Sequence, residues 1–524
     1  MKKAKSAANL NKPVDALSLP ELKCLATESQ IAMPHIHPLK GYLKKTTACV
    51  AVALLSACSL AKYQPLQTLS RIEPDKGYRL LNARQQQAQQ KNDDTFVVLM
   101  FSGGGTRAAA LGYGVLEQLA DQKIWVGGRE KRLIENIDLV YGISGGSILA
   151  IYFSLYGADT VPSFERRFLK QNFQRQLTKQ VFSSAYLPRL SSPEFGRGDL
   201  LQEEFENTIF GKLTFGDLAE RRRGPFAVIS ATDMSLGNRV DFTQEYFDTM
   251  CLNLSKLKLA RAVAASSAVP LIFSPITLNN HGGNCGYTLP AQVQEALDED
   301  VNELQNQTRQ EFARNIKEYE NSQYRPYIHL LDGGLTDNLG LRNLLDTTEF
   351  YPSNMLYQQF KEGRMTKIVV INVNAQNKPI TEIDKSAAIP GFSDVLNAII
   401  NIPIDQHSQE SLRRFRTFAD RWNENPRTNR EGVPISMYFV SLNLRDLPES
   451  SLRREVLNIP TSFYLPSSQI NELKQAASVL LGRSNEYQRL LRDLSVRPEA
   501  NPVSAQTVIS QHETEAAASD VAAP

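Results

Sequence analysis

Ser144 stands in a sequence context that suits a nucleophile. The segment Gly142-Ile143-Ser144-Gly145-Gly146 lies between an apolar run at 139–141 and a helical pattern of apolar residues. A serine on a sharp strand-to-helix turn is exposed at a sheet edge, and the tight turn needs small neighbours such as Gly142 and Gly146. The helix that follows favours developing negative charge. We therefore expect a nucleophilic serine; an ordinary glycine-rich connection is the alternative.

A second glycine-rich loop has the same placement. Gly103-Gly104-Gly105-Thr106-Arg107 follows the apolar run 95–101 and precedes a helical pattern. Successive backbone N–H groups at a helix start form an anion cradle. Such a cradle can bind a phosphate, although the Walker lysine is absent and Ala108 replaces the last glycine of a dinucleotide motif. The other interpretation is an oxyanion hole formed by Gly103, Gly104, Gly105, Thr106 and Arg107, in which Gly103–Thr106 donate their N–H groups.

A carboxylate completes the set. Asp332-Gly333-Gly334 directly follows the apolar run 328–331. Because ligands bind outside the carboxyl ends of strands in α/β sheets, Asp332 is expected at the same edge as the two loops. Taken by itself, this aspartate is better read as a turn residue.

A Ser-Asp-His triad would need a histidine at a suitable position in the chain. Only His281, His329, His407 and His512 follow the predicted leader, and only His407 and His512 have the chain order of an α/β-hydrolase triad. His512 lies in a polar tail, and His407 lacks the loop signals of a catalytic strand end. His329 is expected to be packed in the core.

Strand and helix patterns alternate along the chain. Further strands are predicted at 226–230, 368–373 and 437–442. Helices are predicted at 163–182, 257–266, 291–320, 340–348, 392–400, 405–420, 468–481 and 485–494. This alternation predicts a three-layer α/β/α fold with a mainly parallel central sheet. The predicted organisation is a leader at 1–57, a tether and lead-in helix at 58–94, a catalytic domain at 95–350, an α/β extension packing on the core at 351–495, and a disordered tail at 496–524.

Together the three motifs resemble the signature of the patatin-like phospholipase family. Ala231–Thr243 and the Ala-Ser-x-Ala-x-Pro stretch at 265–270 are similar to two further family blocks. The resemblance covers about 95–345 and implies a Ser144–Asp332 dyad, a glycine-rich oxyanion hole and no metal or cofactor. Two departures are Ala108, where the family often has glycine, and a long insert at 277–325.

The resemblance implies hydrolysis of phospholipid or other acyl esters through an acyl-enzyme. Arg107 then holds the loop, binds a lipid phosphate or simply pairs within the fold. An acyltransferase or thioesterase with the same dyad remains open, as does a lipid-binding lipoprotein without turnover. The formal net charge of +2 gives no reason to expect a nucleic-acid partner.

The first 57 residues carry the positive charge. They hold eight lysines against three acidic residues, a balance of +5, which leaves −3 for the remainder. Lysines precede a short apolar run at 48–55, as in a signal peptide. Leu55-Ser56-Ala57-Cys58 resembles a bacterial lipobox, which implies lipidation of Cys58, membrane anchoring and, with Ser59 following, the outer membrane. Met33 is the expected start of translation, because 1–32 do not fit a signal peptide.

Two other features allow alternatives. Residues 163–182 form a basic amphipathic pattern that suits a membrane interface, but a core-packed helix is favoured. In an oxidising compartment Cys251 and Cys285 would be the only unmodified cysteines, and a disulfide and two buried thiols are equally good expectations.

Overall fold

The structure is a computed structural model that describes 61–495 apart from 81, 84–93, 127, 290–293, 296, 298–303, 343, 346–364 and 379–382. Contacts divide the chain into Met1–Ser59 and Leu60–Pro524. The predicted leader, the Met33 start, Cys58 and the tail at 496–524 all lie outside the described residues. They stay predictions.

Five parallel strands form the main part of the sheet. Their order is β10 (Ser436–Asn443), β9 (Lys367–Asn374), β1 (Thr95–Phe101), β4 (Leu139–Ile143) and β5 (Phe226–Asp233). Every residue of β1, β4 and β5 is buried, as continuous apolar runs predict for strands that are covered on both faces. The predicted α/β/α class with a mainly parallel sheet is confirmed.

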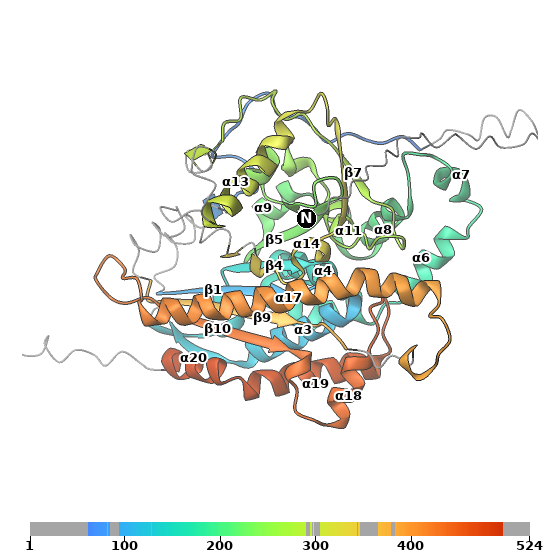
Figure 1. Ribbon diagram of the computed structural model, residues 1–524. Coiled ribbons are helices and arrows are strands. Elements are labelled where there is room, and N and C mark those ends of the chain that lie inside the picture. The colour runs from blue at the N-terminus through green and yellow to red at the C-terminus, as the bar shows by residue number, and fades with distance from the viewer. Residues whose placement is uncertain are drawn as a thin grey trace, which may run out of the picture. The chain divides into compact units, whose positions relative to one another are not determined.

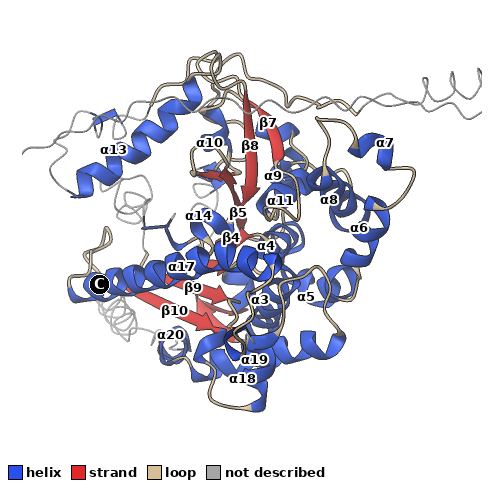
Figure 2. Ribbon diagram, turned by 45° about the vertical axis from the view of Figure 1, so that its right-hand side comes forward, coloured by secondary structure: helices blue, strands red, loops and turns tan. Residues whose placement is uncertain are grey.

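Helices cover this sheet on both sides (Figures 1 and 2). In both views α17 (Phe392–Glu424) lies on one side of β10, and α3 (Gly105–Asp121), α19 (Ser467–Arg483) and α20 (Asn485–Ser495) lie on the other. α19 packs on α3, and α4 (Gly145–Tyr156) packs on β4 and β5. Because α3 and α4 directly follow β1 and β4, both glycine-rich loops lie at one edge of the sheet.

The sheet ends in antiparallel strands that the sequence did not reveal as such. β8 (Tyr327–Asp332) pairs antiparallel with β5, β7 (Ile276–Asn279) pairs antiparallel with β8, and β6 (Arg239–Asp241) pairs antiparallel with β5. β4 pairs with 226–230 of β5, and β8 pairs with the next residues, 231–233. The carboxyl ends of β4 and β8 therefore meet beside β5 from opposite directions. The expected position of Asp332 is right, but the parallel-strand reason for it is wrong.

The remaining helices lie mostly between β4 and β8. They are α5 (Thr160–Phe164), α6 (Phe173–Val181), α7 (Leu187–Leu190), α8 (Arg197–Phe205), α9 (Phe215–Arg221), α10 (Gln244–Asp248), α11 (Leu259–Ser266), α13 (Leu304–Lys317) and α14 (Gly334–Asp337). α18 (Ser451–Asn458) precedes α19, and a hairpin of β2 (Lys123–Val126) and β3 (Arg129–Arg132) follows α3. No described helix has the length and apolar character needed to cross a bilayer.

Several predicted helix boundaries were wrong. The helices predicted at 392–400 and 405–420 are one helix, α17, with Pro403 inside it. Proline removes the N–H that would bond to the carbonyl of Ile399. Ile399 is exposed, so water can reach that region and the helix continues. The helix predicted at 163–182 is interrupted at 170–172, and the helices predicted at 291–320 and 340–348 lie partly outside the described residues.

The segment after Cys58 is not a free tether over the residues that the structure describes. The carbonyl of Ala61 accepts a hydrogen bond from Ser192, and the Tyr63 N–H donates to Glu194. Leu66 donates its N–H to Asn279, and Thr68 forms a β-bridge with Leu252. From Ala61 onward, these contacts hold the segment on the body of the protein.

Cys251 and Cys285 form a disulfide, with 5.7 Å between their Cα atoms. Both cysteines are buried. The bond ties the start of the long insert to the segment after α10, so one of the two equal expectations is met.

Candidate active site

Ser144 occupies a strained turn between β4 and α4. Its φ of 50° and ψ of −124° lie in a backbone region that residues other than glycine rarely adopt. The turn is possible because its neighbours have no side chain: a Cβ on Gly145 would lie 2.0 Å from the Gly105 carbonyl oxygen, and one on Gly146 2.5 Å from that of Phe101. A Cβ on Gly142 would meet the Gly146 carbonyl oxygen at 2.6 Å. The backbone of this turn has the sharp strand-to-helix geometry that was predicted for a nucleophile elbow.

The Ser144 hydroxyl donates a hydrogen bond of 2.8 Å to Oδ2 of Asp332. The other carboxylate oxygen, Oδ1, accepts the N–H of Gly334 at 2.8 Å. Both side chains are buried. Burial raises the pKa of Asp332 to about 6, and the hydrogen bonds from Gly334 and Ser144 oppose that rise. Such a carboxylate is a stronger proton acceptor than an exposed one.

Gly333 permits the close approach of the end of β8 to β5, which brings Asp332 beside Ser144. A Cβ there would lie 2.3 Å from the carbonyl oxygen of Ser230 in β5. Gly334 begins α14 and supplies the N–H that orients the carboxylate. The Asp-Gly-Gly sequence is thus explained by close backbone approach and by one donor.

No histidine among 61–495, as far as the structure describes them, bonds to either residue of this pair. His329 is exposed and its ring contacts the Thr277 hydroxyl, so the predicted core position is wrong. The alternation of faces along β8 explains this, because Ile328 and Leu330 point inward. His407 is exposed on α17. Among the described residues, the Ser144 side chain therefore has the Asp332 carboxylate as its acceptor, and no imidazole lies between them.

The Gly103–Arg107 loop lies against the elbow. A Cβ on Gly103 would be 3.3 Å from Cβ of Ser144. Two of the expected oxyanion donors, however, are already engaged: the Gly103 N–H bonds to Asn338, and the Thr106 N–H bonds to the Ser462 carbonyl at 2.8 Å. These two assignments were wrong, because neighbouring segments use the same donors to fix the loop.

Gly104 and Gly105 are the remaining donors. Within the described part of the chain neither of their N–H groups has a hydrogen-bond partner. Both glycines have a positive φ, 137° and 60°, a conformation that glycine adopts without a steric penalty. This geometry beside Ser144 favours the oxyanion interpretation over phosphate binding.

Arg107 does not point to a ligand. Its buried guanidinium donates Nε–H to the Ala375 carbonyl and Nη1–H to the Ile459 carbonyl, both at 2.8 Å. Burial lowers its pKa to about 10. Of the interpretations left open, the structure supports the one in which the Arg107 side chain holds the loop. The expected place of Arg107 in the oxyanion hole stays a prediction.

Sequence reasoning missed three residues that hold the site in place. Asn338 accepts the Gly103 N–H on Oδ1 at 3.1 Å, and its Nδ2 contacts the Ser408 hydroxyl of α17. Ser266 accepts the Ser144 N–H at 2.9 Å. The loop after α18 contributes the Ser462 carbonyl. Only Ser266 had a signal, since it lies in the Ala-Ser stretch; the others follow from tertiary contacts.

Comparison with known proteins agrees with this geometry. A family model, Patatin-like phospholipase, matches residues 99–345. Residues 99–345 form a patatin-like phospholipase domain. The match contains the elbow, the glycine-rich loop and Asp332, and membership of the family supports lipid hydrolase activity for the domain. No curated protein sequence matches the chain.

Solved structures give distant likenesses. Human GIVD cytosolic phospholipase A2 is 13% identical, with a TM-score of 0.39, over 80% of this chain and 68% of that one. A chain from the complex of full-length SpcU with full-length ExoU of Pseudomonas aeruginosa is 14% identical, with a TM-score of 0.20, over 86% of this chain and 98% of that one. Scores this low add no argument about the site.

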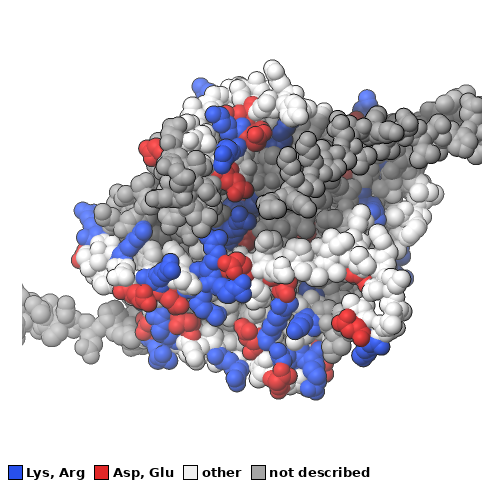
Figure 3. Space-filling view, in the orientation of Figure 1, with Lys and Arg blue, Asp and Glu red and all other residues white. Residues whose placement is uncertain are grey.

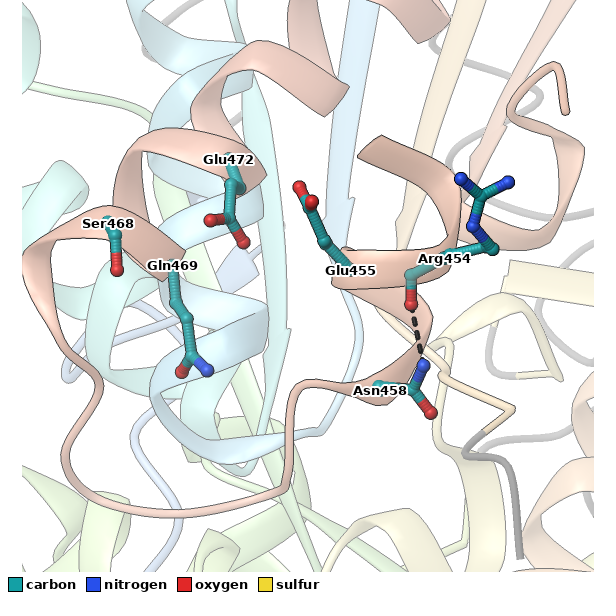
Figure 4. A pocket seen from close by; sticks show the side chains of 6 residues that line it. All are labelled: Arg454, Glu455, Asn458, Ser468, Gln469 and Glu472. Carbon is teal, nitrogen blue, oxygen red and sulfur yellow. Dashed lines mark hydrogen bonds between the residues drawn. The ribbon is translucent and has the colours of Figure 1, made fainter. Parts of the chain in front are cut away.

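Other cavities lie outside the patatin-like site. One of about 470 Å³ lies between α18 and α19 and is lined by polar side chains (Figure 4): Arg454, Glu455, Asn458, Ser468, Gln469 and Glu472. Burial and the Glu455 charge raise the pKa of Glu472. Among the described residues no cluster of three or more histidine, cysteine or acidic side chains could hold a metal ion.

Proposed function

We propose that the patatin-like domain hydrolyses acyl esters of lipids through an acyl-enzyme on Ser144. The observation that carries this proposal is the 2.8 Å hydrogen bond from the Ser144 hydroxyl to the buried carboxylate of Asp332. Asp332 takes the serine proton as the Ser144 oxygen attacks the ester carbonyl, and it then passes that proton to the leaving alcohol. Water repeats the sequence on the acyl-enzyme and releases the fatty acid.

The negative charge of each tetrahedral intermediate needs donors close to Ser144. In this proposal the N–H groups of Gly104 and Gly105 supply them. Loss of one such donor costs about 3–4 kcal/mol of transition-state stabilisation. The positive end of α4 adds a favourable field at the nucleophile.

The test uses Ser144→Ala. A soluble ester and phospholipid vesicles are offered to the wild type and to the variant, and fatty-acid release is measured. We expect a loss of at least about a thousandfold on both substrates. Fluorophosphonate labelling of the wild type, but not of the variant, would place the nucleophile; unchanged hydrolysis by the variant would rule the proposal out.

Product analysis separates the neighbouring functions. An alcohol acceptor added to the assay would give a new ester if the chain is an acyltransferase, and a thioester substrate would be preferred if it is a thioesterase. A lipid-binding protein without turnover would neither label nor release fatty acid.

We also propose that Cys58 carries the lipid anchor and that the protein resides on the outer membrane. The lipobox-like sequence Leu55-Ser56-Ala57-Cys58, which follows lysines and a short apolar run, supports this proposal. Incorporation of labelled fatty acid into the wild type, and its loss in Cys58→Ser, is the expected result. Retention of the label in that variant would contradict the proposal.

A further inference from the structure

A basic surface with exposed apolar side chains lies close to the candidate site. Between 166 and 197 the chain has seven lysine or arginine residues and a single acidic one, Glu194. Six of the cations are exposed: Arg166, Arg167, Lys170, Arg175, Lys179 and Arg197. Phe182 is 81% exposed and Leu187 57%. Exposed apolar side chains that are grouped and surrounded by polar residues can mark a site of interaction with a protein or a membrane.

The apolar side chains of the preceding helices are not part of that surface. Phe164, Phe168, Phe173 and Leu177 are all buried. The favoured interpretation of 163–182 as core-packed is therefore right for these positions. What remains outside is the cationic side of α6 and the turn between α6 and α7.

Contacts connect this surface to the site. α6 packs on α8, and α8 packs on α11, which ends at Ser266 beside the elbow. Arg197, at the start of α8, donates to the Leu271 carbonyl at 2.6 Å. Leu271 and Ile272 are 60% and 56% exposed and follow Ala268, whose carbonyl accepts the Asp332 N–H. Figures 1 and 2 both place α6, α7, α8 and α11 on one side of the molecule.

We infer that Phe182, Leu187, Leu271 and Ile272, together with the six exposed cations, form a docking face for a bilayer that carries anionic headgroups. This inference rests on the proposed lipid substrate. Apolar side chains insert between headgroups while cations bind the anionic surface, as amphipathic interfacial segments do. Leu271 and Ile272 then bring the site to the lipid.

The proposed anchor is consistent with this face. Ala61 is held by Ser192, which lies in the same 166–197 segment. Two residues separate Cys58 from Ala61, and the three Cα–Cα steps between them span at most about 11 Å. A lipid on Cys58 would therefore hold this segment, rather than any distant one, near the membrane surface.

A second exposed apolar stripe offers a matched control. On α17, Phe392, Val395, Ile399 and Ile402 are exposed, and Asp394 is the only charged residue in 386–404. Figure 3 shows a largely white band, with few charged residues, over that end of α17. The exposed fractions of Phe392 and Ile399, 81% and 65%, are similar to those of Phe182 and Leu187, but no cations accompany them. The two surfaces therefore separate hydrophobic adsorption from recognition by cations and apolar side chains together.

The experiment measures sedimentation with vesicles of phosphatidylcholine, with and without phosphatidylglycerol. It uses the full chain with Cys58→Ser, so that a covalent lipid does not contribute, and Ser144→Ala, so that the vesicles stay intact. Vesicle binding then does not depend on turnover. The binding result can therefore be interpreted even if the proposed hydrolase function is wrong.

We expect F182S/L187S to lower the partition coefficient at least about tenfold on both vesicle types. R175E/K179E should lower it on phosphatidylglycerol vesicles by about fivefold for each cation removed, with little change on phosphatidylcholine alone. F392S/I399S should bind as the parent does. The urea unfolding midpoint of F182S/L187S should match that of the parent, which shows that this variant folds. In a chain that keeps Ser144, soluble-ester hydrolysis should also be unchanged by F182S/L187S.

Three outcomes would overturn the inference. One is unchanged vesicle binding by both F182S/L187S and R175E/K179E. Another is loss of binding in F392S/I399S alone, which would move the membrane contact to α17. The third is a dimer in sedimentation velocity that F182S/L187S disperses without any vesicle binding by the parent, which would make the face an interface between two copies.

Discussion

Asp332 and Asp233 are both buried near the end of β5, yet their surroundings differ completely. Asp233 accepts hydrogen bonds from Arg325 at 2.8 Å and from Tyr319 at 3.0 Å, and also from the N–H groups of Ser235 and Leu236. Among the described residues, the Asp332 carboxylate has only one backbone N–H and the Ser144 hydroxyl as donors. A carboxylate that accepts from four donors, one of them an arginine, is held in place as part of the fold, whereas a buried carboxylate without a cation beside it is left able to accept a proton.

Asp233 also holds the long insert in place. Tyr319 and Arg325 follow α13 in that insert, and their contacts with Asp233 keep the insert on β5. The same strand presents Ala231 opposite Asp332. Asp233 therefore fixes the antiparallel extension of the sheet. Asp332 lies in this extension, which places its carboxylate beside Ser144.

The largest expected effect is on activity. Asp332→Asn should lower ester hydrolysis at least about a thousandfold, because an amide cannot accept the Ser144 proton. Asp233→Asn should leave the turnover number of the folded enzyme nearly unchanged at low temperature. Steady-state kinetics of both variants test this difference between the two aspartates. Equal losses of turnover in the two variants would contradict it.

Stability should respond in the opposite way. Asp233→Asn leaves Arg325 buried beside a neutral partner and should lower the free energy of unfolding by about 3–5 kcal/mol. Urea unfolding at neutral pH measures this loss. A change below about 1 kcal/mol would mean that Asp233 is not the main support of the insert.

Asp332→Asn should stabilise the fold at neutral pH. The folded-state pKa of about 6 exceeds the ordinary value of 3.8, so the folded state binds more protons and loses stability as pH rises from about 4 to about 6. Removal of the charge should add about 2–3 kcal/mol at pH 7 and almost nothing below pH 4. Unfolding of wild type and variant at both pH values provides the check, and a gain that persists at low pH would contradict desolvation of the charge as its cause.

Asn338 should affect turnover more than binding. Asn338→Ala removes the side-chain acceptor of the Gly103 N–H and leaves it only the backbone carbonyl of residue 338 at 3.2 Å. This loosens the loop that holds the remaining donors, so we expect kcat to fall about tenfold to a hundredfold. KM for a soluble ester should change little, and the melting temperature by a few degrees at most. A rise in KM at constant kcat would instead place Asn338 in substrate binding.

The smallest effect is the pH dependence of the wild type. Asp332 must be ionised to act as a base, so log kcat/KM should fall by one unit for each pH unit below about 6. A plateau that reaches to pH 4 would mean that the carboxylate is not desolvated in solution. Asp233→Asn should keep the wild-type profile, which links the profile to Asp332.

The sequence predicted the main strands and the glycine-rich loops, because each is encoded by neighbouring residues. Continuous apolar runs located β1, β4, β5, β8, β9 and β10, and the glycine patterns located both loops, because a run or a tight turn is encoded by neighbouring residues. The direction of β8 could not be read in this way, since a short apolar run has the same pattern whether its partner is parallel or antiparallel. Helix ends around 170 and 403 were misjudged for a similar reason: burial and solvent access decide them.

By itself, the sequence determined which groups could react: a hydroxyl, a carboxyl and a set of unsubstituted backbone amides, each in a turn made possible by glycine. Only the tertiary structure decided which amides stay available, because Asn338 and Ser462 come from distant parts of the chain and engage Gly103 and Thr106. It also decided that, among the described residues, Asp233 has a cation beside it and Asp332 does not. Proton affinity depends on everything packed around a carboxylate, and that environment is assembled from segments far apart along the chain.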